Sequence, residues 1–270
     1  MRTARASDHT GRLVPSLAPH SIMLPDNFLY YVLAGFVAQI IDGALGMAYG
    51  VTASSLLVSF GVPPAVTSAT VHAAECFTTG ASAISHHAFG NVDRFLFRPL
   101  LLPAVIGAII GAYLVSSIGD ILRPWVAAYL IVMGVVIIAK AFIQVPGKNV
   151  TSHLAPLGFI GAFLDAVGGG GWGPIVASNL IARGNNVRIT VGSVNAVEFF
   201  VTLAASATFF VTLGFTHWHV ILGLALGGVV AAPFGAWLSK HIPVKPFMII
   251  VGLLVVTLST RNLLAAFHLL

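Results

Sequence analysis

The chain has 270 residues, of which 57% are hydrophobic and only 8% are charged. A soluble domain carries about 25% charged residues, so a soluble enzyme of this size is nearly excluded. The apolar excess also excludes a disordered chain. The formal net charge of +5 does not indicate nucleic-acid binding, because the thirteen Lys and Arg residues are scattered singly. This is the composition of an integral membrane protein.

The apolar runs are long and continuous, which predicts an all-α polytopic bundle rather than an outer-membrane barrel. A hydrocarbon core needs about 20 apolar residues per helical span, so the chain has room for about eight to ten embedded segments. Residues 1–25 are polar and lack the apolar region of a signal peptide. We expect them to form an N-terminal tail, with the first helix starting near Phe28.

The first predicted element, at residues 28–60, is too long for one span and too short for two, and glycines interrupt its middle. A second interrupted element follows later, at residues 153–182. We expect each to form two short helices that meet at a break inside the membrane. Three plainer predicted helices follow each interrupted element, at 64–88, 95–117 and 124–144 and then at 187–212, 217–238 and 246–267.

The two sets of segments are copies of each other. At an offset of 123 residues, positions 35–61 match positions 158–184 without a gap and share eight identities. The same offset pairs Glu75 with Glu198 and His72 with Asn195. The chain therefore divides into four parts: the tail at 1–25, a first transmembrane repeat at 26–145, a linker at 146–152 and a second repeat at 153–270.

Loop cations predict how the two repeats are oriented. If each interrupted segment enters and leaves on one side, the halves have inverted topology. With the tail set aside, eight Lys and Arg residues then fall on one side against two on the other. A parallel arrangement divides the same residues five against five. Because cytoplasmic loops carry the excess of Lys and Arg, the sequence favours two homologous halves of inverted topology.

Four of the eight acidic residues are predicted to be embedded, and they form two duplicated pairs: Asp42 with Asp165, and Glu75 with Glu198. Each costs about 2.5–3.5 kcal/mol to insert, which indicates a role. Asp42 and Asp165 precede glycine clusters, so they either cap broken helices or line the transport path. Glu75 and Glu198 are far from any break, which favours proton coupling over bonds between helices. His72 and Asn195 lie three residues before them and are candidates for the same role.

The glycine clusters are candidate substrate sites. A broken helix exposes half-helix N-termini, whose free N–H groups attract anions. The alternative is that glycines only let helices pack closely, which we favour for Gly107-x-x-x-Gly111 and Gly223-x-x-x-Gly227. The predicted substrate-binding residues are Asp42, Gly43, Gly46, Tyr49 and Gly50 in the first half and Asp165, Gly168, Gly169, Gly170, Gly171, Trp172 and Gly173 in the second.

Gly-Phe-x-x-x-x-x-Asp opens each half, followed by a glycine-rich break, and the first half also contains Gly-x-Pro-Pro at 61–64 and Gly-Asn-Val-Asp at 90–93. With these motifs the chain resembles the TauE/SafE family of sulfite exporters. The resemblance implies transport of sulfite or organosulfonates across the bacterial cytoplasmic (inner) membrane. It also implies roles for Asp42, Gly46, Gly50, Asp165, Gly169 and Gly173. Leu45, Met47 and Ala48 depart from a richer glycine run, so the first break is expected to bind an anion more weakly than the second.

The hypothesis from the sequence is therefore a proton-coupled secondary transporter for a small sulfur-containing anion. A cation or metal-ion carrier, or an anion channel, using the same acids is the alternative. His72 and His86 lie fourteen residues apart, about 21 Å along a helix, so they predict no shared metal site. No enzyme motif and no cofactor are indicated. The expected partners are the anion, protons and the lipid bilayer, with no nucleic acid; a homodimer is one assembly to test.

Overall fold

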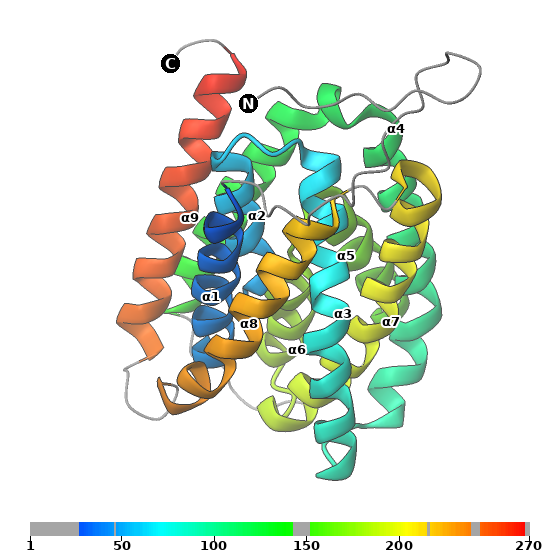
Figure 1. Ribbon diagram of the computed structural model, residues 1–270. Coiled ribbons are helices and arrows are strands. Elements are labelled where there is room, and N and C mark those ends of the chain that lie inside the picture. The colour runs from blue at the N-terminus through cyan, green and yellow to red at the C-terminus, as the bar shows by residue number, and fades with distance from the viewer. Residues whose placement is uncertain (1–26, 46, 143–151, 215–216, 239–243, 268–270) are drawn as a thin grey trace, which may run out of the picture.

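The computed structural model describes residues 27–45, 47–142, 152–214, 217–238 and 244–267. The predicted tail, most of the predicted linker and Gly46 lie outside these residues. Every regular element in the described ranges is helical (Figure 1). The elements are α1 (Phe28–Leu45), α2 (Tyr49–Ser59), α3 (Pro64–Ala88), α4 (Arg94–Lys140), α5 (Leu154–Gly168), η1 (Gly173–Ala177), α6 (Ser178–Ala182), α7 (Val187–Leu213), α8 (Trp218–Leu238) and α9 (Val244–Ala266).

Both predicted helix breaks are present. The first separates α1 from α2, and Ala48 there adopts a left-handed conformation with φ 95°. The second separates α5 from η1, and Gly169 ends α5 with φ 72°. Because a left-handed residue cannot continue a right-handed helix, these two residues set the position of the breaks.

Helix α4 joins two of the predicted segments into one kinked helix. Asp93 caps its start, since the Asp93 carboxylate accepts a hydrogen bond from the Phe95 amide at 2.8 Å. Ile118 has non-helical angles and marks the kink. The second part of α4 begins after this kink and ends at Lys140, so it lies earlier in the chain than the predicted 124–144.

Four helical stretches among the described residues are long and apolar enough to cross a membrane. They are Arg94–Gly119, Ile121–Lys140, Ile189–Leu213 and Met248–Ala266. Shorter apolar helices cover Phe28–Asp42, Leu154–Gly168 and Trp218–Ala231. The apolar parts of the broken helices α1 and α5 are shorter than the about 20 residues of a full span, as their interruption predicts. The all-α polytopic class predicted from composition is confirmed.

The first helix of each half packs against a helix of the other half. Helix α1 packs on α8, and α5 packs on the first part of α4. In both pairs a glycine contacts backbone: a Cβ on Gly35 would collide with the Leu224 backbone, and a Cβ on Gly158 would lie 2.9 Å from the Leu100 carbonyl oxygen. Gly35 and Gly158 are equivalent at the 123-residue offset. The two halves are therefore interleaved through matching close contacts.

The glycine stripes predicted to be packing surfaces occupy these same interfaces. A Cβ on Gly111 would lie 2.6 Å from the Phe163 carbonyl oxygen of α5, and one on Gly107 would collide with the Phe159 carbonyl. On α8, a Cβ on Gly223 would lie 2.6 Å from the Tyr31 Cβ, and Gly227 contacts the Val32 carbonyl in the same way. The close-packing interpretation of these two stripes is confirmed.

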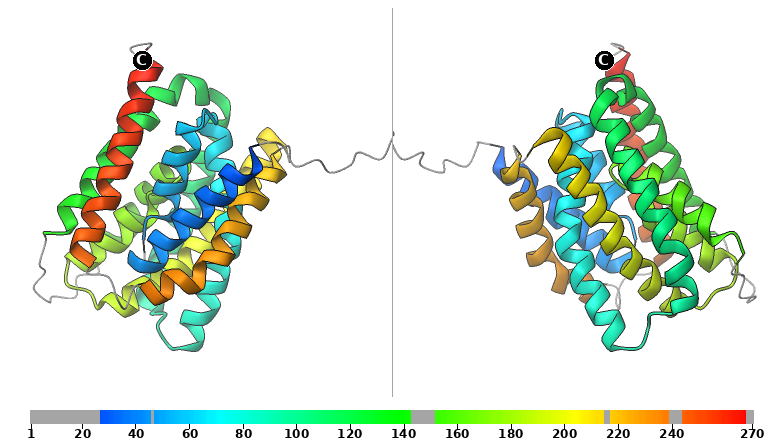
Figure 2. Two further views of the ribbon diagram at one scale, coloured as in Figure 1. Left: turned by 60° about the vertical axis from the view of Figure 1, so that its left-hand side comes forward. Right: turned by 90° about the vertical axis from the view of Figure 1, so that its right-hand side faces the viewer.

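Equivalent helices run in opposite directions in Figure 1, where α3 descends while α7 rises, and the first part of α4 rises while α8 descends. The views in Figure 2 show α1 and α8 side by side across the bundle. Opposite directions are what inverted halves require. Their orientation relative to a membrane stays a prediction, as does the division of the chain at residue 146.

The interface between α1 and α8 supplies a test of this packing. Gly35→Ala places a methyl group against the Leu224 backbone, which cannot move aside cheaply. We expect it to lower the free energy of unfolding by about 1–3 kcal/mol. Gly228→Ala, on the same interface, meets its nearest atoms at 3.8 Å and should be neutral or slightly stabilising. Thermal unfolding in detergent measures both; equal melting temperatures would contradict the predicted contact.

Candidate functional site

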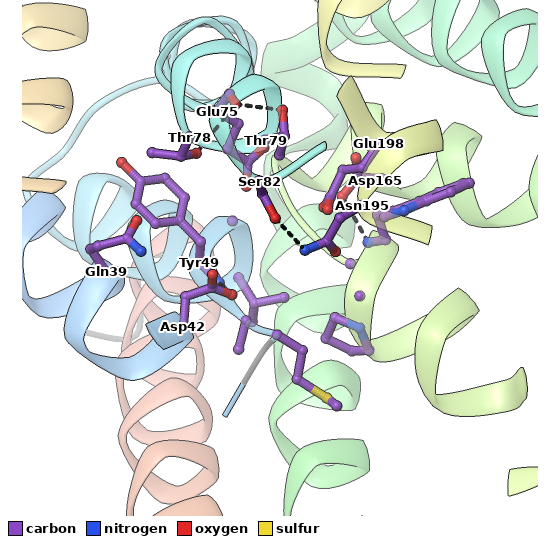
Figure 3. A pocket seen from close by; sticks show the side chains of 18 residues that line it. Gln39, Asp42, Tyr49, Glu75, Thr78, Thr79, Ser82, Asp165, Asn195 and Glu198 are labelled. Carbon is purple, nitrogen blue, oxygen red and sulfur yellow. Dashed lines mark hydrogen bonds between the residues drawn. The ribbon is translucent and has the colours of Figure 1, made fainter. Parts of the chain in front are cut away.

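A cavity of about 130 Å³ lies where the two breaks meet, which is room for several waters or one small ion. Its walls come from both repeats (Figure 3). Ten of the residues singled out in the sequence line it: Asp42, Tyr49, Gly50, Glu75, Asp165, Gly171, Trp172, Gly173, Asn195 and Glu198. The duplicated acids and the two breaks, which the sequence predicts separately, therefore belong to one site.

Asp42 and Asp165 cap the two breaks. Asp42 Oδ1 accepts a hydrogen bond from the Tyr49 amide at 3.3 Å, at the start of α2. Asp165 Oδ1 accepts one from the Trp172 amide at 2.9 Å, just before η1. Each carboxylate thus satisfies an amide that the helix interruption leaves without an intrahelical partner. The structural capping interpretation applies to both residues, and both also line the cavity.

Hydroxyl groups from the first half donate hydrogen bonds to backbone carbonyl oxygens at the end of α5 and in the second break. Ser54 Oγ donates to the Gly169 carbonyl, and Ser68 Oγ donates to the Ala166 carbonyl at 2.5 Å. Tyr129 on α4 donates to the Gly170 carbonyl at 2.9 Å. The carbonyl oxygens that the helix end leaves without intrahelical partners therefore accept hydrogen bonds from protein side chains.

The glycines of the second break divide into two groups. Gly171 and Gly173 line the cavity, whereas Gly168, Gly169 and Gly170 pack against protein. The Gly170 Cα lies against the backbone of Gly50, and a Cβ on Gly168 would collide with the Tyr129 ring. These glycines allow the two breaks to cross at close range. In the first break, Gly43 lies within α1, and Gly46 is outside the described residues.

Glu75 on α3 and Glu198 on α7 face the cavity from the two halves (Figure 3). Beside them Thr79 and its equivalent Thr202 bring their hydroxyl oxygens to 3.5 Å. Equivalent residues can meet only near the axis that relates the two repeats, so the two glutamates lie near this axis. Asn195 donates to the Ser82 hydroxyl at 3.0 Å rather than to an acid.

His72 lies outside the cavity lining, and its ring contacts Asp165 instead of Glu75. His72 Nε2 is 3.1 Å from Asp165 Oδ2, and both side chains are buried. The His72–Glu75 relay suggested by the sequence rests on neighbours three residues apart on one helix. The contact that the structure shows is with the other repeat instead.

The cavity lining includes four carboxyl groups and no Lys or Arg side chain. Lys140 is outside the lining, and its Nζ donates to the carbonyl of the lining residue Pro174 at 2.5 Å. No cluster of three or more His, Cys, Asp or Glu side chains suited to a metal ion occurs within the described residues. The site therefore contains acids, backbone amides and neutral hydrogen-bonding groups.

Sequence reasoning missed several lining residues: Gln39, Met47, Ala48, Val51, Thr78, Thr79, Ser82 and Pro174. A signal was available for some of them. Gln39 lies three residues before Asp42 and shares its helix face, and Thr79 and Ser82 follow Glu75 by four and seven residues. Small hydroxyl residues are common in membrane helices, so this spacing alone does not distinguish a binding surface from packing.

An all-helical bundle with two crossed helix breaks around a polar cavity is the architecture of a polytopic membrane transporter. The TauE/SafE sulfite exporter family matches residues 31–261, and the chain belongs to this family. The chain is 38% identical over 247 residues to the probable membrane transporter protein YtnM of Bacillus subtilis (strain 168), covering 87% of this chain and 82% of that protein.

Two further relatives carry similar names. The probable membrane transporter protein ORF9 of Sinorhizobium sp is 27% identical, with 84% of this chain and 87% of that protein covered. The probable membrane transporter protein YdhB of Bacillus subtilis (strain 168) is 26% identical, with 80% and 89% covered. No solved structure matches the chain. The family and these names indicate a membrane transporter rather than an enzyme.

The two capping aspartates provide an internal comparison. Asp42→Ala removes one amide partner and should cost about 1 kcal/mol of unfolding free energy. Asp165→Ala removes a cap and also leaves the buried His72 without its carboxylate, which should cost about 3–5 kcal/mol. Thermal unfolding in detergent compares the two variants. Equal losses would mean that the His72 contact contributes nothing to stability.

Proposed function

We propose that this protein is a secondary transporter that moves a small sulfur-containing anion, sulfite or an organosulfonate, across the bacterial inner membrane, coupled to protons. The anion binds in the cavity against the second break, and the glutamates take up the coupled protons. The family match supports the substrate class. The residues and the coupling rest on the chemistry of the cavity.

The polarity of the second break is the observation that carries the proposal. Its carbonyl side is occupied by Ser54, Ser68 and Tyr129. At its amide end Gly171 and Gly173 line the cavity, and neither amide donates a hydrogen bond outside the helices within the described residues. Amides at the start of a helix, with their positive dipole end, bind anions. The Trp172 amide between these two glycines is taken by Asp165, so Gly171 and Gly173 are the amides at this break that an oxyanion would contact.

The acids explain why the anion would move together with protons. A carboxylate and a bound anion repel each other strongly in a cavity of low dielectric. Binding is therefore favourable when Glu75 and Glu198 are protonated, and protonation is favourable when the anion is bound. This reciprocal relation is the thermodynamic form of coupling.

A cation carrier is the second candidate, and one observation favours it: four carboxyl groups line the cavity without any Lys or Arg. Ionised carboxylates would attract sodium or a divalent metal. Uptake into proteoliposomes separates the two candidates. The anion proposal predicts counterflow of labelled sulfite that sulfonates or thiosulfate inhibit, and no accumulation of sodium or nickel. Accumulation of either metal without sulfite exchange would overturn it.

Glu198→Gln tests proton coupling. The amide keeps the shape of the side chain but cannot take up or release a proton. We expect this variant to keep sulfite binding, because the amide imitates the protonated acid, and to lose accumulation driven by a pH gradient. Asp93→Asn is the matched control, because it changes another acid to its amide outside the cavity, where Asn caps a helix as well as Asp does. Sulfite accumulation that follows the pH gradient in Glu198→Gln would refute the coupling role.

A further inference from the structure

The ring of His72 is fixed by its own helix. His72 is fully buried on α3, and its Nδ1 lies 2.8 Å from the Ser68 carbonyl oxygen. A carbonyl oxygen can only accept, so Nδ1 carries the hydrogen of this bond. The Phe209 ring from α7 lies against the imidazole, with ring centroids 6.2 Å apart. The other ring nitrogen, Nε2, is thereby aimed at α5.

Nε2 and Asp165 Oδ2 must share one proton. They lie 3.1 Å apart, with the two side chains 0% and 3% exposed. Without a proton between them, two acceptors would face each other and a carboxylate would remain buried without compensation, which is strongly unfavourable. Whether the proton resides on nitrogen or oxygen, the pair carries no net charge. Asp165 therefore lines the cavity as part of a neutral unit.

The first half has no matching pair. Asn195 occupies the position equivalent to His72, and it donates to Ser82 instead of to Asp42. His72–Asp165 is the ion pair that the structure shows among the described residues, so Asp42, Glu75 and Glu198 have no basic side-chain partner there. Among the described residues, a basic side chain therefore compensates a carboxylate on one side of the cavity only. That side is the second break, where Gly171 and Gly173 line the cavity.

We propose that His72 is a positioning residue that makes the second break selective for anions by cancelling the charge of Asp165. The cap on the Trp172 amide needs an oxygen at residue 165, and His72 lets that oxygen belong to a carboxyl group without adding negative charge to the anion site. This inference rests on the proposed function. It goes further, because it assigns the anion to the wall beside Asp165 and excludes the wall beside Asp42.

A series of variants that remove the basic or the acidic member tests the pair. His72→Asn reproduces the residue found in the other half and leaves the Asp165 carboxylate without compensation. We expect sulfite to bind about tenfold or more weakly to this variant. The double variant His72→Asn with Asp165→Asn restores a neutral wall, and its amide oxygen still caps Trp172. We expect it to recover affinity to within about threefold of the unmodified protein. Calorimetry with sodium sulfite on the detergent-purified chain measures both.

A purely structural role predicts a different result. If His72 only held α3 against α5, the double variant would lose the same contact as the single one and would not recover. His72→Gln separates the hydrogen bond from the charge, because its amide donates to Asp165 without supplying a proton. We expect this variant to melt above His72→Asn, because it keeps the hydrogen bond, and to bind sulfite as weakly as His72→Asn. A single variant with normal affinity, or a double variant without recovery, overturns the inference.

The same series distinguishes this inference from the proposed function. If the unmodified protein binds neither sulfite nor methanesulfonate, the anion function itself fails. If it binds them and the His72 variants bind equally well, only the role of the pair fails. Asp93→Asn serves as the control, because Asp93 lies outside the cavity lining and we expect less than a threefold change in sulfite affinity there. A loss at Asp93 as large as at His72 would mean that the His72 effect is not specific to the cavity and would overturn the inference.

Discussion

The structure depends on one constraint: a helix that is interrupted inside a bilayer must satisfy its free backbone groups without water. The two breaks meet this constraint with the same device, an aspartate that accepts a hydrogen bond from the amide seven residues later. The carboxylate must lie beside the break, so a charged group enters the centre of the bundle for structural reasons. The cavity, its acids and the need for compensation all follow from this placement.

The two halves differ in the side chains that satisfy the groups at each break. Ser54 and Ser68 hold the second break, while the positions equivalent to them in the second half are Ala177 and Val191. His72 pairs with the second aspartate, and its counterpart Asn195 bonds elsewhere. Duplication explains the shared fold of the halves. The changes at these positions give one break fixed carbonyls and a compensated acid, so a symmetric pair of breaks yields an asymmetric site.

Much of the fold can be predicted from the sequence because its strongest signals are local. The glycine clusters mark both breaks, and the apolar runs give the start of α1 at Phe28 and of α7 at Val187. Contacts between distant segments cannot be read this way. The period of a helix places His72 beside Glu75, but its partner Asp165 lies 93 positions away on another helix. Likewise the apolar pattern predicts separate helices at 95–117 and 124–144, yet α4 runs through both with a kink at Ile118.

The neutral pair also limits the number of coupled protons. Four carboxyl groups line the cavity, and each negative charge there opposes an anion. The proton shared by His72 and Asp165 is held by two buried partners and by the ring's bond to Ser68, so releasing it would leave a buried charge alone. Asp42 is also constrained, since it caps α2. Within the described residues, the carboxyl groups of Glu75 and Glu198 do not cap a helix, and the two residues lie near the axis that relates the halves. They are therefore the groups whose protonation can change with least cost to the fold.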